Sequence, residues 1–248
     1  MKNLLKEFDA ISLQEMQDIR LMNRVDTKFV ADISLLPSFL ARAREGYLVQ
    51  VIDGESVLPY STLYFDTPDY HFYREHHDGR LNRQKLRIRS YESSDLHFLE
   101  IKRKNNHGRT KKKRIAFTQG TRLQDAAYQE FLTKHLHLPV NDLSPALSNH
   151  FHRITLVNRK HTERLTLDFD LRFHNERNMQ DYALPRLLIV EIKRDGLVPS
   201  GAIEILRQLR IKKSGFSKYC MGLCLTDSTL KQNKFKTKIR KIQKLWKN

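Results

Sequence analysis

The stretch RQKLRIRSYESSDLHFLEIKRK, residues 83–104, decides the fold. In its first half Arg87 and Arg89 alternate with Leu86 and Ile88, and its second half repeats this alternation of charged and apolar side chains. Period-two alternation is typical of a β-strand with one apolar and one charged face. The stretch therefore predicts two strands joined by a short turn, and it raises the question of what lies against the charged face.

Strands of the same kind occur along most of the chain. They are predicted at residues 24–32, 47–53, 60–67, 109–118, 151–161, 163–174 and 185–195. Helical spacing and capping signals predict helices at residues 12–22, 34–45, 121–137 and 200–210, and a basic helix within 226–248. About eight strands with few long connections indicate an α+β fold, an antiparallel β-barrel or tunnel with flanking helices. We expect residues 1–248 to form a single domain, because no linker or repeat interrupts them.

The composition favours a polyanionic partner. The chain has 45 Lys and Arg residues against 28 Asp and Glu residues, a net charge of +17, and its pI is near 9.9. Nucleic acid, anionic lipid and phosphate chains all attract such a surface. No apolar run approaches the ~20 residues of a membrane helix, and the first residues lack the apolar core of a secretory signal. We expect a cytoplasmic protein, with membrane association through a partner as an alternative.

The alternation rule sorts most charged strand residues onto one face of each strand, opposite an apolar face. The sets are Arg24 with Lys28; Lys85 with Arg87 and Arg89; Glu100 with Lys102 and Lys104; Lys112 with Arg114; Arg164 with Thr166, Asp168 and Asp170; and Glu191 with Lys193. In a closed barrel these faces would point inward. Like charges 4 Å apart repel by up to ~4 kcal/mol at an effective dielectric of 20, so such a lumen must be wet and hold an anion.

A phosphate chain fits this lumen, because arginine forks and lysine ammonium groups both bind phosphate oxygens. The few carboxylates of the charged faces, Glu100 and Glu191 among them, could hold a divalent cation that bridges phosphates. The competing interpretation is an open sheet with a solvated charged face and helices behind it. The recurrence of Arg and Lys on nearly every strand favours the lumen.

Other conspicuous residues suggest less specific roles. The histidines at 76–77, 135–137 and 150–152 lack the spacing of a zinc site. Cys220 and Cys224 lie one helical turn apart, which favours a packing role over a redox one. The segment 231–248, which includes Trp246, predicts a basic helix that either contacts an anionic membrane or a partner, or caps a tunnel mouth.

Seven segments, taken in order, resemble a known family. They are LMNRVDTKFV, YSTLYFDTPDYHFY, RQKLRIRSY, FLEIKRK, ERLTLDFDL, LIVEIKRDG and SGFSKYCMG, and together they cover roughly residues 8 to 225. They are similar to the polyphosphate polymerase domain of the vacuolar transporter chaperone (VTC) family, which belongs to the CYTH-like triphosphate tunnel metalloenzymes. The resemblance implies a β-tunnel that binds ATP with Mn²⁺ or Mg²⁺ and transfers the γ-phosphate to a growing inorganic polyphosphate chain.

The resemblance also implies roles for individual residues. The predicted catalytic residues are Arg87, Arg89, Arg164 and Glu191. The predicted substrate-binding residues are Arg24, Lys28, Lys85, Lys102, Lys112, Arg114, Arg159, Lys193, Ser217 and Lys218, with Lys113 as an alternative to the Lys112 register. Glu191 is the predicted metal ligand, with Glu100 as the second candidate. Ser217 and Lys218 would close one mouth of the tunnel.

One departure bears on the reaction. Classical tunnel triphosphatases begin with Glu-x-Glu-x-Lys, whereas this chain has Arg24, Asp26 and Lys28. The loss of two metal-binding carboxylates favours polymer handling over simple hydrolysis. The alternatives are a tunnel triphosphatase that hydrolyses triphosphate or a nucleotide, and a binding module for polyphosphate or nucleic acid without activity. Sequence-specific nucleic-acid binding is disfavoured, since the charged faces carry no aromatic stacking platform.

Overall fold

A computed structural model describes residues 2–19, 21, 24–106, 110–196 and 198–244. The strands are β1 (Ala10–Ile11), β2 (Arg24–Asp32), β3 (Tyr47–Gln50), β4 (Leu58–Asp66), β5 (Arg83–Tyr91), β6 (Leu96–Lys104), β7 (Thr110–Ala116), β8 (Ser144–Asn158), β9 (Glu163–Asn175), β10 (Asp181–Leu184) and β11 (Leu187–Asp195). The α-helices are α1 (Lys2–Leu5), α2 (Leu13–Asp18), α3 (Leu36–Ala43), α4 (His71–Asp78), α5 (Ala126–His135), α6 (Gly201–Gln208), α7 (Lys218–Thr226) and α8 (Lys236–Lys244).

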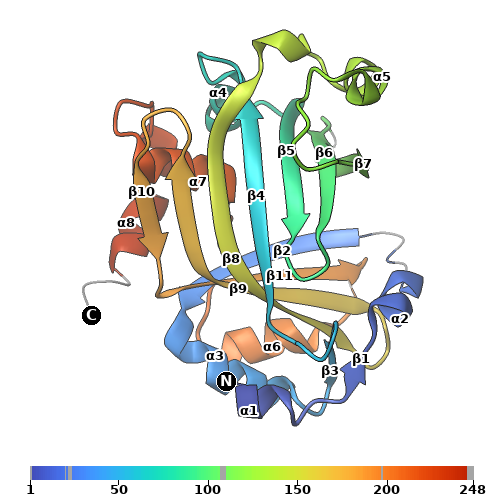
Figure 1. The fold of residues 1–248 in the computed structure, drawn as a ribbon. Coiled ribbons are helices and arrows are strands. Elements are labelled where there is room, and N and C mark those ends of the chain that lie inside the picture. Colours follow the sequence, from blue (N-terminus) through green and yellow to red (C-terminus); the bar gives the residue numbers. More distant parts are fainter. Residues whose placement is uncertain (1, 20, 22–23, 107–109, 197, 245–248) are drawn as a thin grey trace.

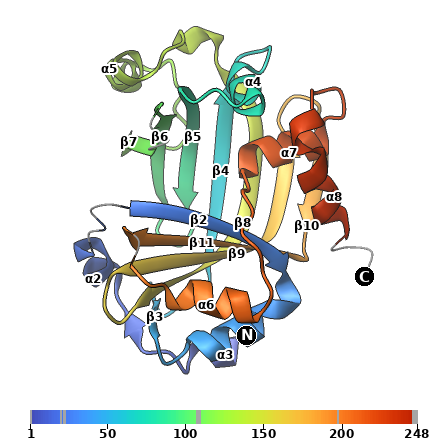
Figure 2. The same cartoon turned by 180° about the vertical axis from the view of Figure 1, so that it is seen from behind.

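One strongly curled sheet dominates the molecule (Figure 1). Its main path runs β2-β11-β9-β8-β4-β5-β6-β7, and every neighbouring pair along this path is antiparallel. Seen from behind, β2 and β11 cross almost horizontally in front of the upright strands β4 and β5 (Figure 2). The path ends at β2 on one side and β7 on the other, so the sheet is a half-barrel. The prediction of an α+β fold with an antiparallel, tunnel-like sheet is confirmed.

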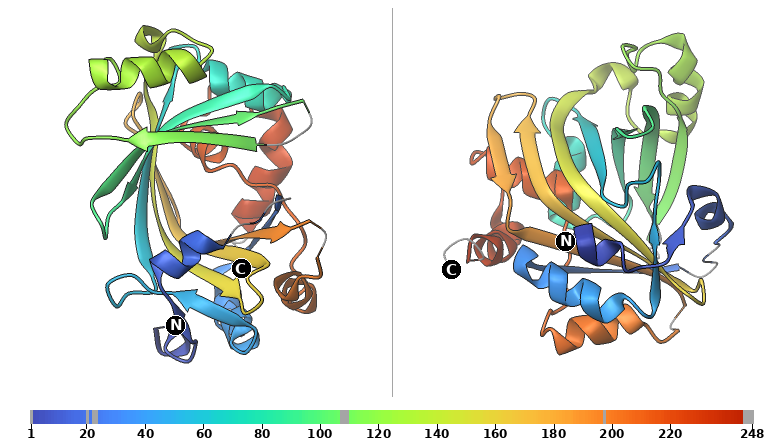
Figure 3. Two further views of the ribbon diagram at one scale, coloured as in Figure 1. Left: turned by 90° about the vertical axis from the view of Figure 1, so that its right-hand side faces the viewer. Right: turned by 60° about the horizontal axis from the view of Figure 1, so that its bottom comes forward.

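Two apolar cores hold the half-barrel in shape. Helices α1, α3 and α6 cover the outer face of β2, β9 and β11, where Phe39, Leu167 and Val190 are fully buried. Helices α3 and α6 lie below β2 and β11 in Figure 2. The second core lies around α7, which packs on β8, β9 and β10 and also contacts α4. Figure 3 shows how the curl of the sheet leaves a concave side between these two layers.

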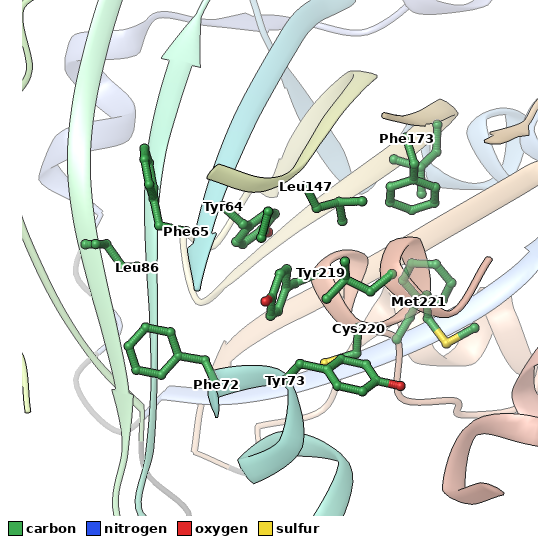
Figure 4. Close-up of a cluster of buried hydrophobic side chains, with 14 of the residues drawn as sticks. Tyr64, Phe65, Phe72, Tyr73, Leu86, Leu147, Phe173, Tyr219, Cys220 and Met221 are labelled. Carbon is green, nitrogen blue, oxygen red and sulfur yellow. The ribbon is translucent and has the colours of Figure 1, made fainter. Parts of the chain in front are cut away.

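Helix α7 fills the inner side of the sheet at one end. Tyr219 stacks on Tyr64 of β4, with ring centroids 5.0 Å apart, and both lie in the cluster of Figure 4. A Cβ added at Gly222 would overlap the side chains of Leu147 and Phe173, so this position needs glycine for close approach. The helix therefore fits against the sheet through one small residue among large ones.

The prediction for residues 214–224, a lead into the basic helix, was incomplete. Residues 218–226 form α7, whose side chains are almost all buried. A helix that is apolar all round gives no amphipathic signal. Cys220 and Cys224 are buried free thiols within α7, as a packing role requires. The basic helix itself is α8, whereas Trp246 lies outside the described residues.

Helix α4 and strand β10 were also missed. The buried carboxylate of Asp66 accepts hydrogen bonds from the backbone N–H groups of Phe72 and Tyr73, at 2.8 and 3.0 Å. It also accepts from the hydroxyl of Tyr219 in α7. The first turn of α4 is thus capped by a residue far outside the usual N-cap position, and sequence spacing does not reveal such a cap.

A β-bulge between β8 and β9 changes which residues share a face. The pairing shifts between His150 and His152, and Asp170 has a positive φ of 50°. Phe169 packs in the core under α3 and α6, whereas Leu171 packs in the core around α7. The prediction that Asp170 continues the charged face of Asp168 was wrong, because one extra residue reverses the alternation.

Candidate functional site

The strand register places the predicted charged residues side by side on the concave side of the sheet. Lys85 lies opposite Lys102, which lies opposite Lys112; Arg87 lies opposite Glu100, which lies opposite Arg114. Across the sheet, Glu191 lies between Lys28 and Thr166, and Lys193 lies between Asp26 and Arg164. We call this set of side chains, together with Arg89, Arg153, Asp168 and Lys218, the charged face.

Glu100 is the carboxylate in the part of the charged face that β5, β6 and β7 form. It is 1% exposed, and its Oε2 accepts from Arg87 Nε at 2.8 Å and Nη2 at 2.5 Å. Lys112 Nζ donates to Oε1 at 3.3 Å. Burial alone would raise the pKa of Glu100, but Arg87 and Lys112 outweigh burial and lower that pKa to about 2. Glu100 is therefore a fixed anion that orients Arg87.

Asp168, near the centre of the charged face, is likewise an anion that orients the cations beside it. Arg153 donates to it from Nε at 2.6 Å and from Nη2 at 2.8 Å, a bidentate pair. Lys218, the first residue of α7, makes an ion pair with the same carboxylate and lies 3.9 Å from the ring centre of Phe151. Despite burial, Arg153 and Lys218 hold the pKa of Asp168 well below its usual range.

Arg153 is a functional candidate that the sequence analysis missed. Burial would lower its pKa, but Asp168 raises it above the usual range. Its guanidinium also lies over the rings of Tyr60 and Phe151, at 5.0 and 5.3 Å. The sequence does contain a signal for this residue. Arg153 and Thr155 alternate with the apolar Ile154 and Leu156, which is the pattern of a strand with one polar face.

Glu191 is the carboxylate on the β2–β11 side. It contacts the Lys28 ammonium, and 19% of its side chain is exposed. Burial favours the neutral acid, but Lys193 and Lys28 hold the pKa of Glu191 well below its usual value. Glu191 is therefore ionised and within reach of a ligand in the concave side.

Several cations of the charged face form no ion pair with a carboxylate among the described residues. Arg89 is 5% exposed and its Nε has no hydrogen-bond partner among the described residues. Burial, then the neighbouring Arg87, lower the pKa of Arg89 to about 10. Repulsion from Arg87, then burial, hold the pKa of Lys102 well below its usual value. Burial also lowers the pKa of Lys193. These groups would be stabilised by an anion that carries several charges.

Two buried neutral groups lie next to residues of the charged face. Thr62, opposite Arg89 in the register, has a buried hydroxyl without a partner among the described residues, and so does Thr166, opposite Glu191. Buried hydroxyls are normally hydrogen-bonded, so unpaired ones mark a strained or ligand-binding place. Thr62 lies on β4, next to the strand of Arg89, and Thr166 lies on β9, next to the strand of Glu191 and Lys193.

Residues at the rim of the charged face are bound more locally. Arg24 is half-exposed and pairs with Asp26 at 2.7 Å. Arg164 donates to the carbonyl of Met16 at 2.5 Å, and burial followed by Arg24 lowers its pKa. Ser217 caps α7 and accepts a hydrogen bond from Lys85 Nζ at 2.8 Å. These contacts bring Arg24, Arg164 and Ser217 to the charged face or to its edge.

The structure distinguishes the two registers considered for β7. Lys112 lies opposite Lys102, whereas Lys113 lies opposite the buried Ile101, on the other face of the strand. Arg114 lies over the ring of Phe98 at 4.4 Å. The register therefore favours Lys112 and Arg114.

Arg159 does not reach the charged face. It follows the end of β8, is exposed, and makes an ion pair with Asp9 at 2.6 Å. Its Nε donates to the carbonyl of Glu45 at 2.8 Å. A tunnel-lining role for Arg159 is thus not supported, and Arg153 is the β8 arginine that lies among the phosphate-binding candidates.

The carboxylates fit a metal ion only in one arrangement. Within the described part of the chain, no group of three or more His, Cys, Asp or Glu residues is arranged to hold a metal. Both oxygens of Glu100 already accept hydrogen bonds from cations, so Glu100 fits poorly as a ligand. Glu191 is ionised and partly exposed, which fits the common arrangement in which Mg²⁺ takes one protein carboxylate and the oxygens of bound phosphates.

The comparisons with known proteins agree with this geometry. The VTC domain family matches residues 23–226. The solved structure of bh2851 from Bacillus halodurans, a proposed adenylate cyclase, is 14% identical, with a TM-score of 0.52 over 79% of this chain and 96% of that one. HpAC1 from Hippeastrum, described with a dominant triphosphatase activity, is 14% identical, with a TM-score of 0.49 over 80% of this chain and 94% of that one. No curated protein matches the chain.

A curled antiparallel sheet whose concave side carries rows of Arg and Lys defines a tunnel-like fold. The chain belongs to the VTC domain family. None of the described helices has both the length and the apolar character needed to cross a membrane.

Proposed function

We propose that the protein is a polyphosphate polymerase, which transfers the γ-phosphate of ATP to the end of an inorganic polyphosphate chain. One observation carries the choice of polymerase over hydrolase: the carboxylates of the charged face are paired with cations. Glu100 pairs with Arg87, Asp168 with Arg153, and Glu191 with Lys28. Their pKa values are all low, so they are weak bases for activating water.

A terminal phosphate needs no such base, because its oxygen is already ionised. That oxygen attacks the γ-phosphorus of ATP, a new P–O–P bond forms, the bond to the β-bridging oxygen breaks, and ADP leaves with the electron pair. No proton has to move. Phosphoryl transfer of this kind depends on positioning and on neutralising charge.

The residues of the charged face fit these two tasks. Arg87, held by Glu100, and Arg153, held by Asp168, are fixed forks that would bind the phosphates of the two reactants. Arg89, with its unpaired Nε, would stabilise the charge on the transferred group. Lys28, Lys102, Lys193 and Lys218 would neutralise the remaining phosphates. Glu191 would hold a divalent metal ion, which would offset the charge of the bound phosphates.

Incubation of the protein with ATP and Mn²⁺ tests this proposal. We expect ADP together with a ladder of phosphate polymers on a gel, and loss of both in Glu191→Gln. The matched control is Glu204→Gln, which removes an exposed carboxylate of α6 that pairs with Arg207. We expect the control to keep full activity. ADP with orthophosphate and no ladder would instead indicate a triphosphatase, and binding without turnover would indicate a binding module.

A further inference from the structure

A second group of cations lies beyond the charged face, at one mouth of the concave side. Arg83 and Lys104 form a cross-strand pair of β5 and β6, two residues outward from the pair of Lys85 and Lys102. The period of two keeps them on the same side of the sheet, about 7 Å further along the strands. Both side chains are partly exposed. The row of cations that begins at Arg89 thus continues to the mouth.

Helix α8 adds a third cation to this mouth. A Cβ built on Gly215 would lie 3.5 Å from the Nζ of Lys238. Gly215 stands two residues before Ser217, whose hydroxyl accepts from Lys85. Lys238 therefore lies beside the loop that leads into α7. The apolar side of α8 packs on the protein, with Ile242 2% exposed, and Lys238, one helical turn before Ile242, is partly buried on the same side.

His76 shows that these cations converge on one place. Its Nδ1 lies 3.1 Å from the sulfur of Cys220, inside the cluster of α4 and α7. Burial lowers the pKa of His76 to about 2, and the surrounding cations contribute in the order Lys85, Arg83, Lys238 and Lys104. Residues from β5, β6 and α8 thus act on one imidazole.

Little negative charge balances this mouth. Among the described residues, no carboxylate forms an ion pair with Arg83, Lys104 or Lys238. Glu75 is the acid that acts on Arg83, and it also pairs with His71 at 3.6 Å. From Arg89 to Arg83, the row of same-side cations on β5 spans about 20 Å.

We propose that Arg83, Lys104 and Lys238 form a binding site for inorganic polyphosphate at the tunnel mouth, which holds the growing chain as it leaves the charged face. This inference rests on the proposed polymerase function. A linear polyanion fits, because the pair of Arg83 and Lys104 continues the inner cations along the strands and because one long chain can occupy both sites. A membrane surface fits less well, since the apolar residues of α8 are buried within the protein.

If polyphosphate binds at this mouth, the effect of a substitution there depends on the length of the polyphosphate chain. We would measure the affinity of the full chain for tripolyphosphate and for polyphosphate of about a hundred units, without ATP. We expect Lys238→Glu and Lys104→Glu each to weaken binding of the long chain about tenfold, as loss of a charge-assisted phosphate contact does, and to change tripolyphosphate affinity less than twofold. Lys238→Gln should give a smaller effect of the same kind.

The matched control is Lys244→Glu, the same charge change on the same helix about 9 Å further along. We expect it to bind both ligands as the native chain does. Equal weakening for short and long chains, or an equal effect of Lys244→Glu, would overturn the site. So would a native protein that binds long polyphosphate no more tightly than tripolyphosphate. Binding to vesicles with anionic lipid that alone depends on Lys238 would assign the surface to a membrane and overturn the inference.

The assay also separates this inference from the proposed function, because it needs no turnover. A protein that shows the length-dependent pattern but makes no polymer from ATP would contradict the polymerase and leave the mouth site intact. A protein that makes polymer without the pattern would contradict the mouth site alone. Thermal unfolding of each variant confirms that it is folded.

Discussion

Strands β9 and β11 present two faces that differ in almost every physical respect. On the outer face Leu165, Leu167, Val190 and Ile192 are all 0% exposed beneath α3 and α6. On the inner face of the same two strands lie Arg164, Thr166, Asp168, Glu191 and Lys193. Burial of the apolar face stabilises the folded protein. On the charged face of these strands, burial lowers the pKa values of the cations. One face therefore stabilises the fold, and the other is arranged to bind a ligand.

The largest expected effect comes from Arg89, which forms no ion pair with a carboxylate in the described part of the chain. We expect Arg89→Met to reduce the rate of phosphate transfer about 10³-fold, because the group that neutralises the transferred phosphoryl is lost. The free energy of unfolding should be unchanged or higher, since a buried, repelled cation is removed. Initial rates and chemical denaturation measure the two effects.

Arg122→Met is the control for this substitution, because Arg122 is exposed and lies outside the charged face. It should change neither quantity. If Arg89→Met unfolded the protein, the charged face would be part of what holds the fold, and the comparison between the two faces would fail.

The opposite result is expected on the apolar face. Leu167→Ala should lower the free energy of unfolding by about 2–5 kcal/mol, because a fully buried side chain is replaced by a cavity. Activity per folded molecule should remain within a factor of two, since the adjacent charged residues keep their contacts. Denaturation midpoints and active-site titration measure these effects. A loss of activity without a loss of stability would contradict the division of roles.

Tyr219 connects the apolar core around α7 with the charged face, because it is buried beside Lys218 and donates to Asp66. We expect Tyr219→Phe to lower the free energy of unfolding by about 1–3 kcal/mol, the cost of removing one hydrogen bond from a buried carboxylate. Because α7 positions Lys218, the KM for ATP should rise a few-fold while kcat changes little. A large fall in kcat at unchanged KM would mean that α7 takes part in the chemical step.

The last expected effect is a dependence on pH. Burial lowers the pKa of Lys218 from 10.5 to about 8, although Asp168 opposes the shift. Between about pH 8 and 10.5 the unfolded chain therefore binds more protons than the folded one. On this account the stability of the ligand-free protein gains a contribution from Lys218 as pH rises through that window. Affinity for tripolyphosphate should fall over the same window, as the ammonium loses its charge.

Calorimetric stability and binding isotherms at several pH values test these opposite trends. The variant Lys218→Met should remove this contribution from both. If stability and affinity changed in the same direction in the native chain, and Lys218→Met altered neither, the assignment of this ionisation to Lys218 would be wrong.

Most of the charged face could be predicted from alternation alone. The pattern in residues 83–104 placed Lys85, Arg87 and Arg89 on one side of a strand, and the structure agrees. Alternation is visible because each strand has one wet and one dry face, which is a local property. The strand bounds at residues 24–32 and 83–91 were predicted without error for the same reason.

What the sequence did not reveal depends on contacts between distant residues. The bulge at Asp170 reverses the alternation of β9, and nothing local announces it. Helix α7 is apolar all round, so only its fit around Gly222 explains its position. Arg159 and Arg153 both follow strand-like residues, and only the pairing of β8 with β9 shows that Arg153 faces Asp168.

We propose that the charged face binds a multiply charged phosphate ligand, which stabilises its unpaired cations. Thermal unfolding of the native chain with and without tripolyphosphate tests it most directly. At 100 times the dissociation constant, we expect stabilisation of about 2.7 kcal/mol, or a rise in Tm of roughly 5–10 °C. Arg89→Met should show a much smaller rise at the same concentration. An unchanged Tm in the native chain would contradict the claim.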